Sequence, residues 1–509
     1  MSESLQQQNR ALRAQLKKAQ EQIEKQAVLI KQLQNLIFGK KTEVIEELAD
    51  GQLSLFDEEQ FVEPEHDVTE VAKTTVTKVV HHRKSKIKPT RAEFLNQLPQ
   101  TEEVVPLNDR KCPTCQQPMK YIGKRLARRE VRMKEPELYC VNYYQESCKC
   151  EHCSKDGVDK IISSRVPMAL LPHSYFSSSI MAQIANYKFN LALPFHRQVE
   201  LWQTVGLPIN DKQMAVNTIK VSQTYLVPLY ERLCQLTKEE SVIHMDETPF
   251  RVINSGKSKS YFWVTRTTKE FAHHQMVVFH HANTRSGNMV GQIVGQAYAG
   301  LIMCDGYGGY SNNLYPKARF GTCLVHIRRE FANIIKSSPR NLRSSKALQA
   351  VKLLSRVFHT ENQLNYQTAE EKLAERQLKL RPLLDNFYQY LETIRHPIGK
   401  LRDAIENAMK LRSRVYRIFE NGQLPLSNNP VEQSIRPSTL IRKNCLFAKT
   451  DAGAKANAIF YSVVQTAKLN QLNVYQYLKY LFDHLPSSKK EDLEGYLPWA
   501  KTVQAECHQ

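Results

Sequence analysis

The stretch SVIHMDETPF, residues 241–250, decides the fold that we expect for the central part of the chain. It is a short, mostly apolar run, which is typical of a β-strand packed against a core. Because side chains alternate between the two faces of a strand, Asp246 shares a face with Val242 and His244. A carboxylate on an otherwise apolar strand is costly unless a cation or a hydrogen-bond donor satisfies it. Asp246 is therefore a candidate site residue.

Three further strand-like runs follow, and the last of them also carries an acid. In GLIMCDGYGGY, residues 300–310, Asp305 shares a face with Leu301 and Met303. The glycines after Asp305 permit a tight turn and leave its carboxylate accessible. The other two runs are SYFWVTRTT, residues 260–268, and HQMVVFHHANT, residues 274–284.

A third acid lies in LSNNPVEQSIRP, residues 426–437. Asn429 suits the N-cap of a helix, Pro430 suits its first position, and Glu432 follows in the first turn. Asn429 and Glu432 also have the spacing of a capping box, an alternative that explains Glu432 without any function. We expect Pro437 to limit or kink this helix, so that it begins as a short segment.

Two strand-end aspartates and a helix-borne glutamate can hold two divalent cations ~3.5–4 Å apart. Such a pair activates an attacking oxygen and stabilises the leaving oxygen in a displacement at phosphorus. Mg²⁺ prefers oxygen ligands, and Mn²⁺ accepts the same ones. The nearby chain is basic, since residues 317–356 contain ten Lys and Arg and a single acid. The three acids therefore predict phosphodiester chemistry on DNA.

The composition agrees with a polyanionic partner. The 509 residues contain 71 Lys and Arg against 51 Asp and Glu, a formal net charge of +20. Hydrophobic residues make up 41% of the chain, which excludes a wholly disordered basic tail, and the small number of glycines, 18, favours helix. No apolar run approaches the ~18 residues needed to span a bilayer, and the first residues lack a signal core. We expect a cytoplasmic protein without a membrane partner.

Residues 1–48 carry an apolar heptad repeat, which predicts a coiled-coil helix that pairs with a partner helix. A single amphipathic helix packed on its own domain is the alternative. Residues 49–92 have the composition of a charged linker, with seven acids and no Lys or Arg over residues 57–70 and seven bases and no acid over residues 73–91. The basic half can lie along phosphates, although the acidic half can also neutralise it.

Residues 93–165 contain two C-x-x-C pairs, which predict a zinc-binding module. Four thiolates can hold one tetrahedral Zn²⁺. Cys140 and Cys148 are alternative ligands, and a group of unpaired buried thiols is the alternative without metal. Residues 111–134 contain eight Lys and Arg and one acid, so the module is expected to bind DNA. The predicted zinc ligands are Cys112, Cys115, Cys150 and Cys153.

Residues 166–238 are expected to be helical and to bind DNA. Within residues 194–222 we expect a helix, a turn at Gly206, and a second helix capped by Asn210 or Asp211. This pattern resembles a helix-turn-helix, whose second helix enters a major groove. An ordinary helical hairpin is the alternative.

Several segments together resemble the insertion-sequence-66 family of bacterial transposases. They are HMDETPFRV, LIMCDGYGGY, CLVHIRREF and the block of residues 427–470, together with FGKKTE after the heptads and YLPW near the end of the chain. The resemblance implies a ribonuclease H-like catalytic domain with an Asp-Asp-Glu triad. Matched position by position, the triad is Asp246, Asp305 and Glu432, so Glu432 is expected to bind metal as well as, or instead of, capping its helix. Small accessory proteins from the same element and a place near the bacterial nucleoid are also implied.

The predicted architecture is multidomain and mainly α-helical, with an α/β catalytic core. The core comprises residues 239–334 and 421–480, which form a mixed β-sheet domain. A helical insertion at residues 335–420 separates its two parts. Residues 481–509 are expected to form a C-terminal tail.

Basic residues near the acids are candidate DNA contacts. Arg436 lies one helical turn after Glu432 and can reach a phosphate near the metals, whereas a salt bridge to Glu432 is the alternative. Cys323-x-x-His326 lies in the basic stretch, and because no second pair of ligands is evident we interpret it as a structural feature rather than as a zinc site. The candidate DNA-binding residues are Arg328, Arg329, Arg436, Arg442, Lys443 and Lys449.

The predicted function is that of a DNA transposase that uses two Mg²⁺ or Mn²⁺ ions and one structural Zn²⁺. Cleavage would free a 3′-hydroxyl at the end of the element, and the same site would join it to target DNA without a covalent protein–DNA intermediate. The expected partners are double-stranded DNA, as terminal inverted repeats and as target, and at least one further copy of the chain. Two alternatives are a non-catalytic DNA-binding relic and a metal-dependent nuclease or resolvase that does not join strands.

Overall fold

The structure is a computed structural model that describes residues 138–144, 146–149, 161–163, 166–172, 174–257, 259–337, 345–488 and 492–508. The predicted coiled coil, the charged linker and the four predicted zinc ligands lie outside these residues. The chain divides into two compact units, and the elements below all belong to the unit that includes Val141–Gln509. This part of the chain is mixed α/β, with more helix than strand.

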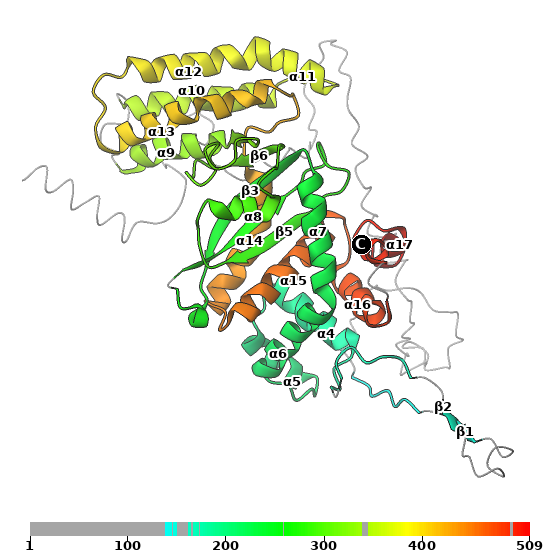
Figure 1. The fold of residues 1–509 in the computed structure, drawn as a ribbon. Coiled ribbons are helices and arrows are strands. Elements are labelled where there is room, and N and C mark those ends of the chain that lie inside the picture. The colour runs from blue at the N-terminus through cyan, green and yellow to red at the C-terminus, as the bar shows by residue number, and fades with distance from the viewer. Residues whose placement is uncertain are drawn as a thin grey trace, which may run out of the picture. The chain divides into compact units, whose positions relative to one another are not determined.

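A β-sheet forms the centre of the described unit (Figure 1). It has five strands in the order β5-β4-β3-β6-β7. β3, β4 and β5 are antiparallel neighbours, whereas β6 and β7 run parallel to β3. All four predicted strands are therefore confirmed, and β7 was not predicted. The strands are β3 (Val242–Phe250), β4 (Ser260–Arg266), β5 (Val277–Ala282), β6 (Leu301–Cys304) and β7 (Arg319–Thr322).

β7 escaped prediction because its four residues, RFGT, contain no apolar run. A Cβ at Gly321 would lie 2.2 Å from the sulfur of Met303, so another residue at this position would require the Met303 side chain to shift. Gly321 thus weakens the strand pattern in the sequence while it leaves room for the Met303 side chain of β6.

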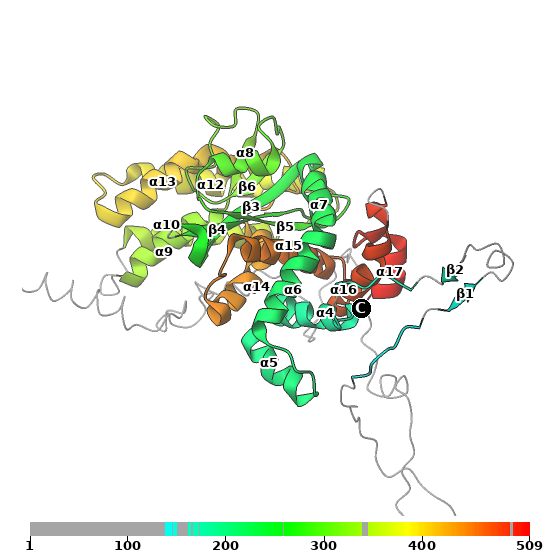
Figure 2. The same cartoon turned by 60° about the horizontal axis from the view of Figure 1, so that its bottom comes forward.

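Helices cover both faces of the sheet, as Figure 2 shows. On one face α8 (Asn288–Val294) packs in a core with Trp263 of β4 and with Ile243 and Met245 of β3. On the other face lie α14 (Asn429–Cys445) and α15 (Asp451–Leu469). Hydroxyls of α15 also bond the edge strand β5, because Ser462 accepts from the Phe279 N–H at 2.8 Å and Thr466 accepts from the Val277 N–H at 3.1 Å. Backbone groups that an edge strand would expose are satisfied in this way.

The helices before the sheet match the predicted helix, turn and helix. Gly206 takes a left-handed φ of +82°, and Asn210 caps the second helix in a capping box with Gln213. The second helix continues without a break through η3 and α7, so it is one end of a longer helical run. Whether it enters a DNA groove stays a prediction. The elements are α4 (Ser178–Ala185), η2 (Asn186–Asn190), α5 (Phe195–Thr204), α6 (Asp211–Val221), η3 (Ser222–Leu226) and α7 (Val227–Glu239).

The segment between Asp305 and Glu432 contains a helical module with its own hydrophobic core. Leu324 and Ile327 belong to that core, so the module includes α9 and begins before residue 335, the expected boundary. Fully buried Arg376 stabilises it by binding Glu361 and the backbone carbonyl of Ile418. Its helices are α9 (Leu324–Ser337), α10 (Lys346–Asn362), α11 (Ala369–Glu375), η6 (Arg376–Leu380), α12 (Arg381–Thr393), α13 (Gly399–Val415) and η7 (Tyr416–Phe419).

The expected C-terminal tail is folded. α16 (Val474–His484) and α17 (Lys501–Cys507) pack on the helices of the main core, where Leu497 and Val503 are buried. The Tyr477 hydroxyl donates to the carbonyl of Tyr496 at 2.8 Å and fixes the connection between the two helices. Among the helices that the structure describes, none combines the length and apolarity needed to cross a bilayer.

Within the predicted zinc module, two short strands form an antiparallel pair, β1 (Ser147–Lys149) and β2 (Ile161–Ser163). Cys148 on β1 stands opposite Ile162. Cys148 and Cys140, the alternative ligands, are both exposed.

Candidate active site

Three residues with possible ligand atoms lie side by side where β6 and β7 end. Asp305 and Cys323 directly follow these two strands, whereas Asp246 lies in the middle of β3 and not at its end as expected. The register of β3 and β6, continued by two residues, sets Asp246 opposite Asp305. The register of β6 and β7, continued by one residue, sets Asp305 opposite Cys323. Neighbouring strands are ~4.8 Å apart, and this edge of an open α/β sheet is where ligands commonly bind. Asp246, Asp305 and Cys323 therefore form one row across β3, β6 and β7.

The two aspartates share their end of the row with Glu247. One carboxylate oxygen from each of Asp246, Glu247 and Asp305 lies within 4.8 Å of the others. Burial and the neighbouring charges raise the pKa of Asp246 to about 8, with Glu247 contributing more than Asp305 and Glu432 contributing least. A cation would relieve this repulsion. Because every donor is a carboxylate oxygen, the set fits Mg²⁺.

Glu247 is a site residue that the sequence reasoning missed, because strand alternation assigns it to the face opposite Asp246. Its side chain is 1% exposed and pairs with Arg285, whose Nη2 lies 2.6 Å from Oε1. The Tyr310 hydroxyl donates to the other carboxylate oxygen at 2.8 Å. Burial and the charge of Asp305 raise the pKa of Glu247, whereas its bonds to Tyr310 and Arg285 lower it. The acid beside Asp246 in the sequence was the signal that could have identified it.

α14 supplies Glu432, and the predicted capping box is wrong. The helix begins one residue earlier than expected, with Asn428 at the N-cap and no side-chain capping bond. Glu432 therefore lies beyond the capping positions, and its carboxylate is available for other contacts. Pro437 lies inside the helix, which continues to Cys445 rather than ending at the proline.

Asn428 anchors the start of α14 to β3. Its amide nitrogen donates to the carbonyl of Met245 at 3.0 Å, and its amide oxygen accepts from Nδ1 of His244 at 2.8 Å. Both side chains are completely buried, and burial lowers the pKa of His244 to about 4, which keeps the ring neutral. Since His244 is two residues before Asp246, this pair sets the distance between Glu432 and the aspartates.

Two arginines hold α14 across β3 and β4. Arg266 donates to the carbonyl of Pro430 and, at 3.1 Å, to the hydroxyl of Ser434. Arg442 donates to Thr248 at 3.0 Å and to the carbonyl of Pro249. Arg442 is thus part of the support of α14, although it was predicted as a DNA contact.

The other candidate DNA contacts differ in exposure. Arg436, Lys443 and Lys449 are exposed, on α14 and in the segment that follows it. Arg328 is half-buried on α9 and donates to Ser355 at 3.3 Å, and Arg329 is also half-buried. The alternative salt bridge from Arg436 to Glu432 is not among the ion pairs of the described residues, where Glu432 instead faces His326.

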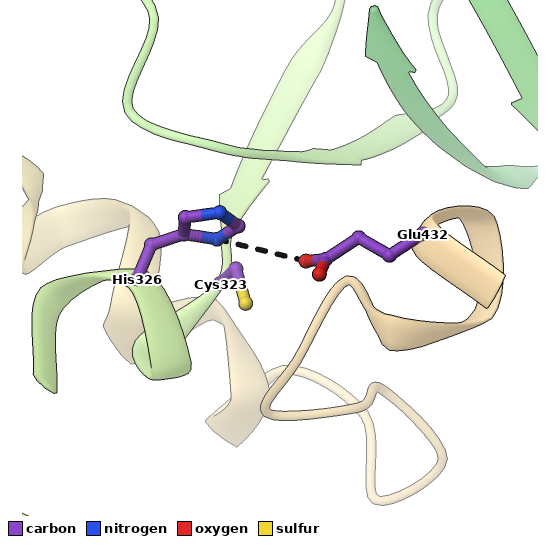
Figure 3. Close-up of side chains that lie close together, drawn as sticks. All are labelled: Cys323, His326 and Glu432. Carbon is purple, nitrogen blue, oxygen red and sulfur yellow. Dashed lines mark ion pairs between the residues drawn. The ribbon is translucent and has the colours of Figure 1, made fainter. Parts of the chain in front are cut away.

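A second group of possible ligands joins the far end of the row to α14 (Figure 3). Ligand atoms of Cys323, His326 and Glu432 lie within 4.8 Å of one another, and Nδ1 of His326 is 3.8 Å from Oε1 of Glu432. Burial, followed by the charge of Glu432, raises the pKa of the Cys323 thiol to about 12. Glu432 therefore lies between two groups: it faces Cys323 and His326, and its charge still acts on Asp246.

A family model described as the transposase IS66 family matches residues 173–456, more than half of the chain. The chain belongs to the IS66 family of transposases. The matched region runs from the helices before the sheet through the helical module to α15, so it contains every residue of both ligand groups. Two further models match, the IS66 C-terminal element over residues 462–499 and the transposase C of IS166 homeodomain over residues 26–102. Residues 26–102 lie outside the described part of the chain.

Individual relatives match most of the chain. The uncharacterized protein y4hP of Sinorhizobium fredii is 24% identical over 376 residues, which are 70% of this chain and 67% of the relative. The uncharacterized protein y4jD of the same organism is 23% identical over 422 residues, 79% of this chain and 80% of the relative. No activity is established for either relative by its name.

Proposed function

We propose that this IS66 family member is an active DNA transposase that cleaves the ends of its element and joins them to target DNA. The observation that carries the proposal is the row of Asp246 and Asp305, with Glu432 projecting from α14 close enough to raise the pKa of Asp246. Clustered carboxylates of this kind suit phosphoryl transfer in a chain whose family consists of transposases.

The catalytic fold that we propose is ribonuclease H-like. In support, an antiparallel set of three strands is extended by two parallel strands, and helices cover both faces. In chain order, Asp246 lies on the first strand of the sheet, Asp305 follows the fourth strand, and Glu432 lies on a helix after the helical module.

Asp246 and Asp305 would hold Mg²⁺ or Mn²⁺, with Glu432 as the third ligand. When bound, two such ions activate the attacking oxygen and stabilise the leaving one. Glu247 adds negative charge while Arg285 and Tyr310 hold it in place. Asn428 and Arg266 fix α14, and thereby Glu432, against β3 and β4.

DNA binding by this chain is also part of the proposal. Arg436, Lys443 and Lys449 are exposed around the third acid, where they would contact phosphates. The match of residues 26–102 to a homeodomain-type element supports a second DNA-binding region. The zinc module with its one Zn²⁺, the self-associating helix and the accessory proteins are expectations that the described residues do not address.

One reaction separates this function from its alternatives. The purified protein is incubated with labelled DNA from the ends of its element, Mg²⁺ and a target plasmid. Joined products are expected; cleavage without joining would favour a nuclease, and binding without either would favour a relic.

Asp246→Asn, Asp305→Asn and Glu432→Gln should each lower cleavage and joining by at least about 10³-fold, because each removes charge from the set that holds the cations. Asp483→Asn is the matched control, since this acid pairs with Lys479 on α16, outside the site. Omission of Mg²⁺ should abolish both reactions. Joining that persists in the Asp246 and Glu432 variants would show that the assignment of the site is wrong.

A further inference from the structure

Two buried polar atoms near Cys323 lie close to each other without forming a hydrogen bond. Nδ1 of His326 and Oε1 of Glu432 are shielded from solvent, and neither has a hydrogen-bond partner among the described residues. They are 3.8 Å apart, which is too long for a hydrogen bond. Buried polar atoms without partners are costly, so an unmet ligand is a physical explanation for both at once.

The sulfur of Cys323 completes this group. It lies within 4.8 Å of the ligand atoms of His326 and Glu432, and Cys323 is completely buried. Backbone groups of Val325, His326 and Asn428 lower the pKa of the Cys323 thiol, whereas burial raises it more. Binding of a metal ion would displace the thiol proton, because the thiolate is the form of cysteine that binds metal.

Rigid elements hold all three side chains. The Cys323 N–H donates to the carbonyl of Cys304 at 3.0 Å, which continues the pairing of β6 with β7. His326 lies in the first turn of α9, and the Leu324 N–H donates to the carbonyl of Leu426 at 2.9 Å. That contact ties the start of α9 to the segment that leads into α14. Cys323, His326 and Glu432 therefore converge without any rearrangement of the backbone.

We propose that Cys323, His326 and Glu432 bind one transition-metal ion of the zinc type. A sulfur, an imidazole nitrogen and a carboxylate oxygen form a donor set that suits Zn²⁺ and not Mg²⁺. Zinc bonds of ~2.0–2.2 Å to nitrogen and oxygen put tetrahedral ligands ~3.4 Å apart, so the 3.8 Å gap needs to close by only a few tenths of an ångström. Three protein ligands leave one position open for water.

Glu432 is a possible ligand of both this site and the site formed by the two aspartates. The inhibition described below follows from this sharing and rests on the proposed function. The Glu432 carboxylate cannot serve both metal groups fully, because Cys323 and His326 lie at one end of the row and Asp246 lies at the other. A zinc ion held by Cys323 and His326 therefore draws Glu432 away from the aspartates. Zinc should inhibit DNA cleavage, and its release should restore it.

Metal binding tests the site without any reaction. The full-length protein is stripped of metal and titrated with Co²⁺, which shows a thiolate-to-metal absorption band when cysteine is a ligand. Wild type should bind one more Co²⁺ per chain than Cys323→Ser or His326→Asn, because the separate cysteine module contributes equally to all three. Cys507→Ser, a buried cysteine on α17, is the matched control and should behave like wild type.

Equal Co²⁺ stoichiometry and equal absorption in wild type and both variants would overturn the proposal. If Cys323→Ser fails to fold, His326→Asn still decides, since the His326 side chain is 31% exposed and its replacement leaves the core intact.

A cleavage assay with added Zn²⁺ tests the consequence. His326→Asn should need at least about tenfold more Zn²⁺ than wild type for half-inhibition, each measured against its own zinc-free rate. A protein that binds the additional ion and never cleaves DNA would refute the proposed function and leave the metal site standing. A protein that cleaves DNA while binding no additional ion would refute the metal site alone.

Discussion

Asn428 is completely buried, and both ends of its amide bind β3. Its partners are a ring nitrogen of His244 and the carbonyl of Met245, which lie just before the first aspartate. No charge is involved, so the pair acts through geometry and leaves the electrostatics of the acids unchanged. Asn428 is a positioning residue for Glu432.

Asn428→Ala should destabilise the protein by about 1–3 kcal/mol, because it leaves buried groups of His244 and Met245 without partners. Cleavage should fall by roughly 10²-fold, since α14 loses its anchor beside the site. The control is Asn429→Ala, which removes the same side chain from the next position. Denaturant unfolding and the cleavage rate are the measurements, and equal results for the two variants would contradict the positioning role.

The partners of a site residue are hard to read from a sequence when they are distant along the chain. Asp246 and Asp305 were predicted, because each is a carboxylate beside apolar strand residues, Asp246 within β3 and Asp305 directly after β6. The bond between His244 and Asn428 joins residues 184 positions apart, and only the assembled sheet brings them together. Glu432 was predicted as a ligand through the family resemblance, whereas its contact with His326 depends on the helical module.

Among the elements, η2 carries a lysine in an unusual environment. Lys188 is half-buried where η2 packs on α15, donates to Oδ1 of Asn457 at 3.1 Å, and lies 4.0 Å from the ring centre of Phe195. Burial lowers its pKa to about 8. Keeping this ammonium group charged therefore lowers the stability of the folded protein, and its contacts with Asn457 and Phe195 offset part of that loss.

Lys188→Met should remove a pH dependence of stability. Between pH 8 and pH 10.5 the unfolded chain keeps the proton on Lys188 and the folded chain loses it, so this residue makes the free energy of unfolding rise with pH. Below pH 8 the penalty is fully present. The free energy of unfolding of the variant, minus that of wild type, should therefore be larger at pH 7.5 than at pH 10. The expected difference between the two pH values is on the order of 2–3 kcal/mol.

Denaturant unfolding at the two pH values measures this difference. Lys220→Met, an exposed lysine on α6, is the matched control and should shift by the same amount at both. If Lys188→Met also shifts equally at pH 7.5 and pH 10, the lysine does not lose its proton in the folded state as argued.

Local patterns in the sequence predicted most elements, and packing between distant segments explains the exceptions. β3 to β6 and the pair α5 and α6 follow from apolar spacing and turn residues. β7 was missed because Gly321 serves the contact with Met303 and contributes no apolar side chain. The start of the helical module was placed too late, because α9 follows β7 directly and its apolar face belongs to a core built by later helices.

For the whole molecule, the net charge of +20 predicts DNA binding that weakens steeply with salt. The exposed cations around Glu432 are expected to contribute to the salt dependence of the DNA-binding constant. They are Arg436, Lys443 and Lys449, whereas Arg442 is occupied within the protein.

Replacing all three exposed cations by Gln should make the slope of log K against log salt less negative by about 2.7, at ~0.9 for each phosphate that is no longer neutralised. The control replaces three exposed lysines on α7, α15 and α17, namely Lys238, Lys468 and Lys501, and keeps the same net charge. Binding titrations at several salt concentrations measure both slopes. Equal slopes for the two triple variants would show that the cations near Glu432 do not bind DNA.

The long interval between Asp305 and Glu432 also has a consequence for the newly made protein. The two aspartates leave the ribosome early, whereas α14 and the α15 hydroxyls that satisfy β5 follow only after the entire helical module has been synthesised. At ~5–20 residues per second, that delay is on the order of ten seconds. Under the proposed function, a nascent chain carries both aspartates and an open sheet edge before Glu432 has been made, so DNA cleavage would become possible only late in translation.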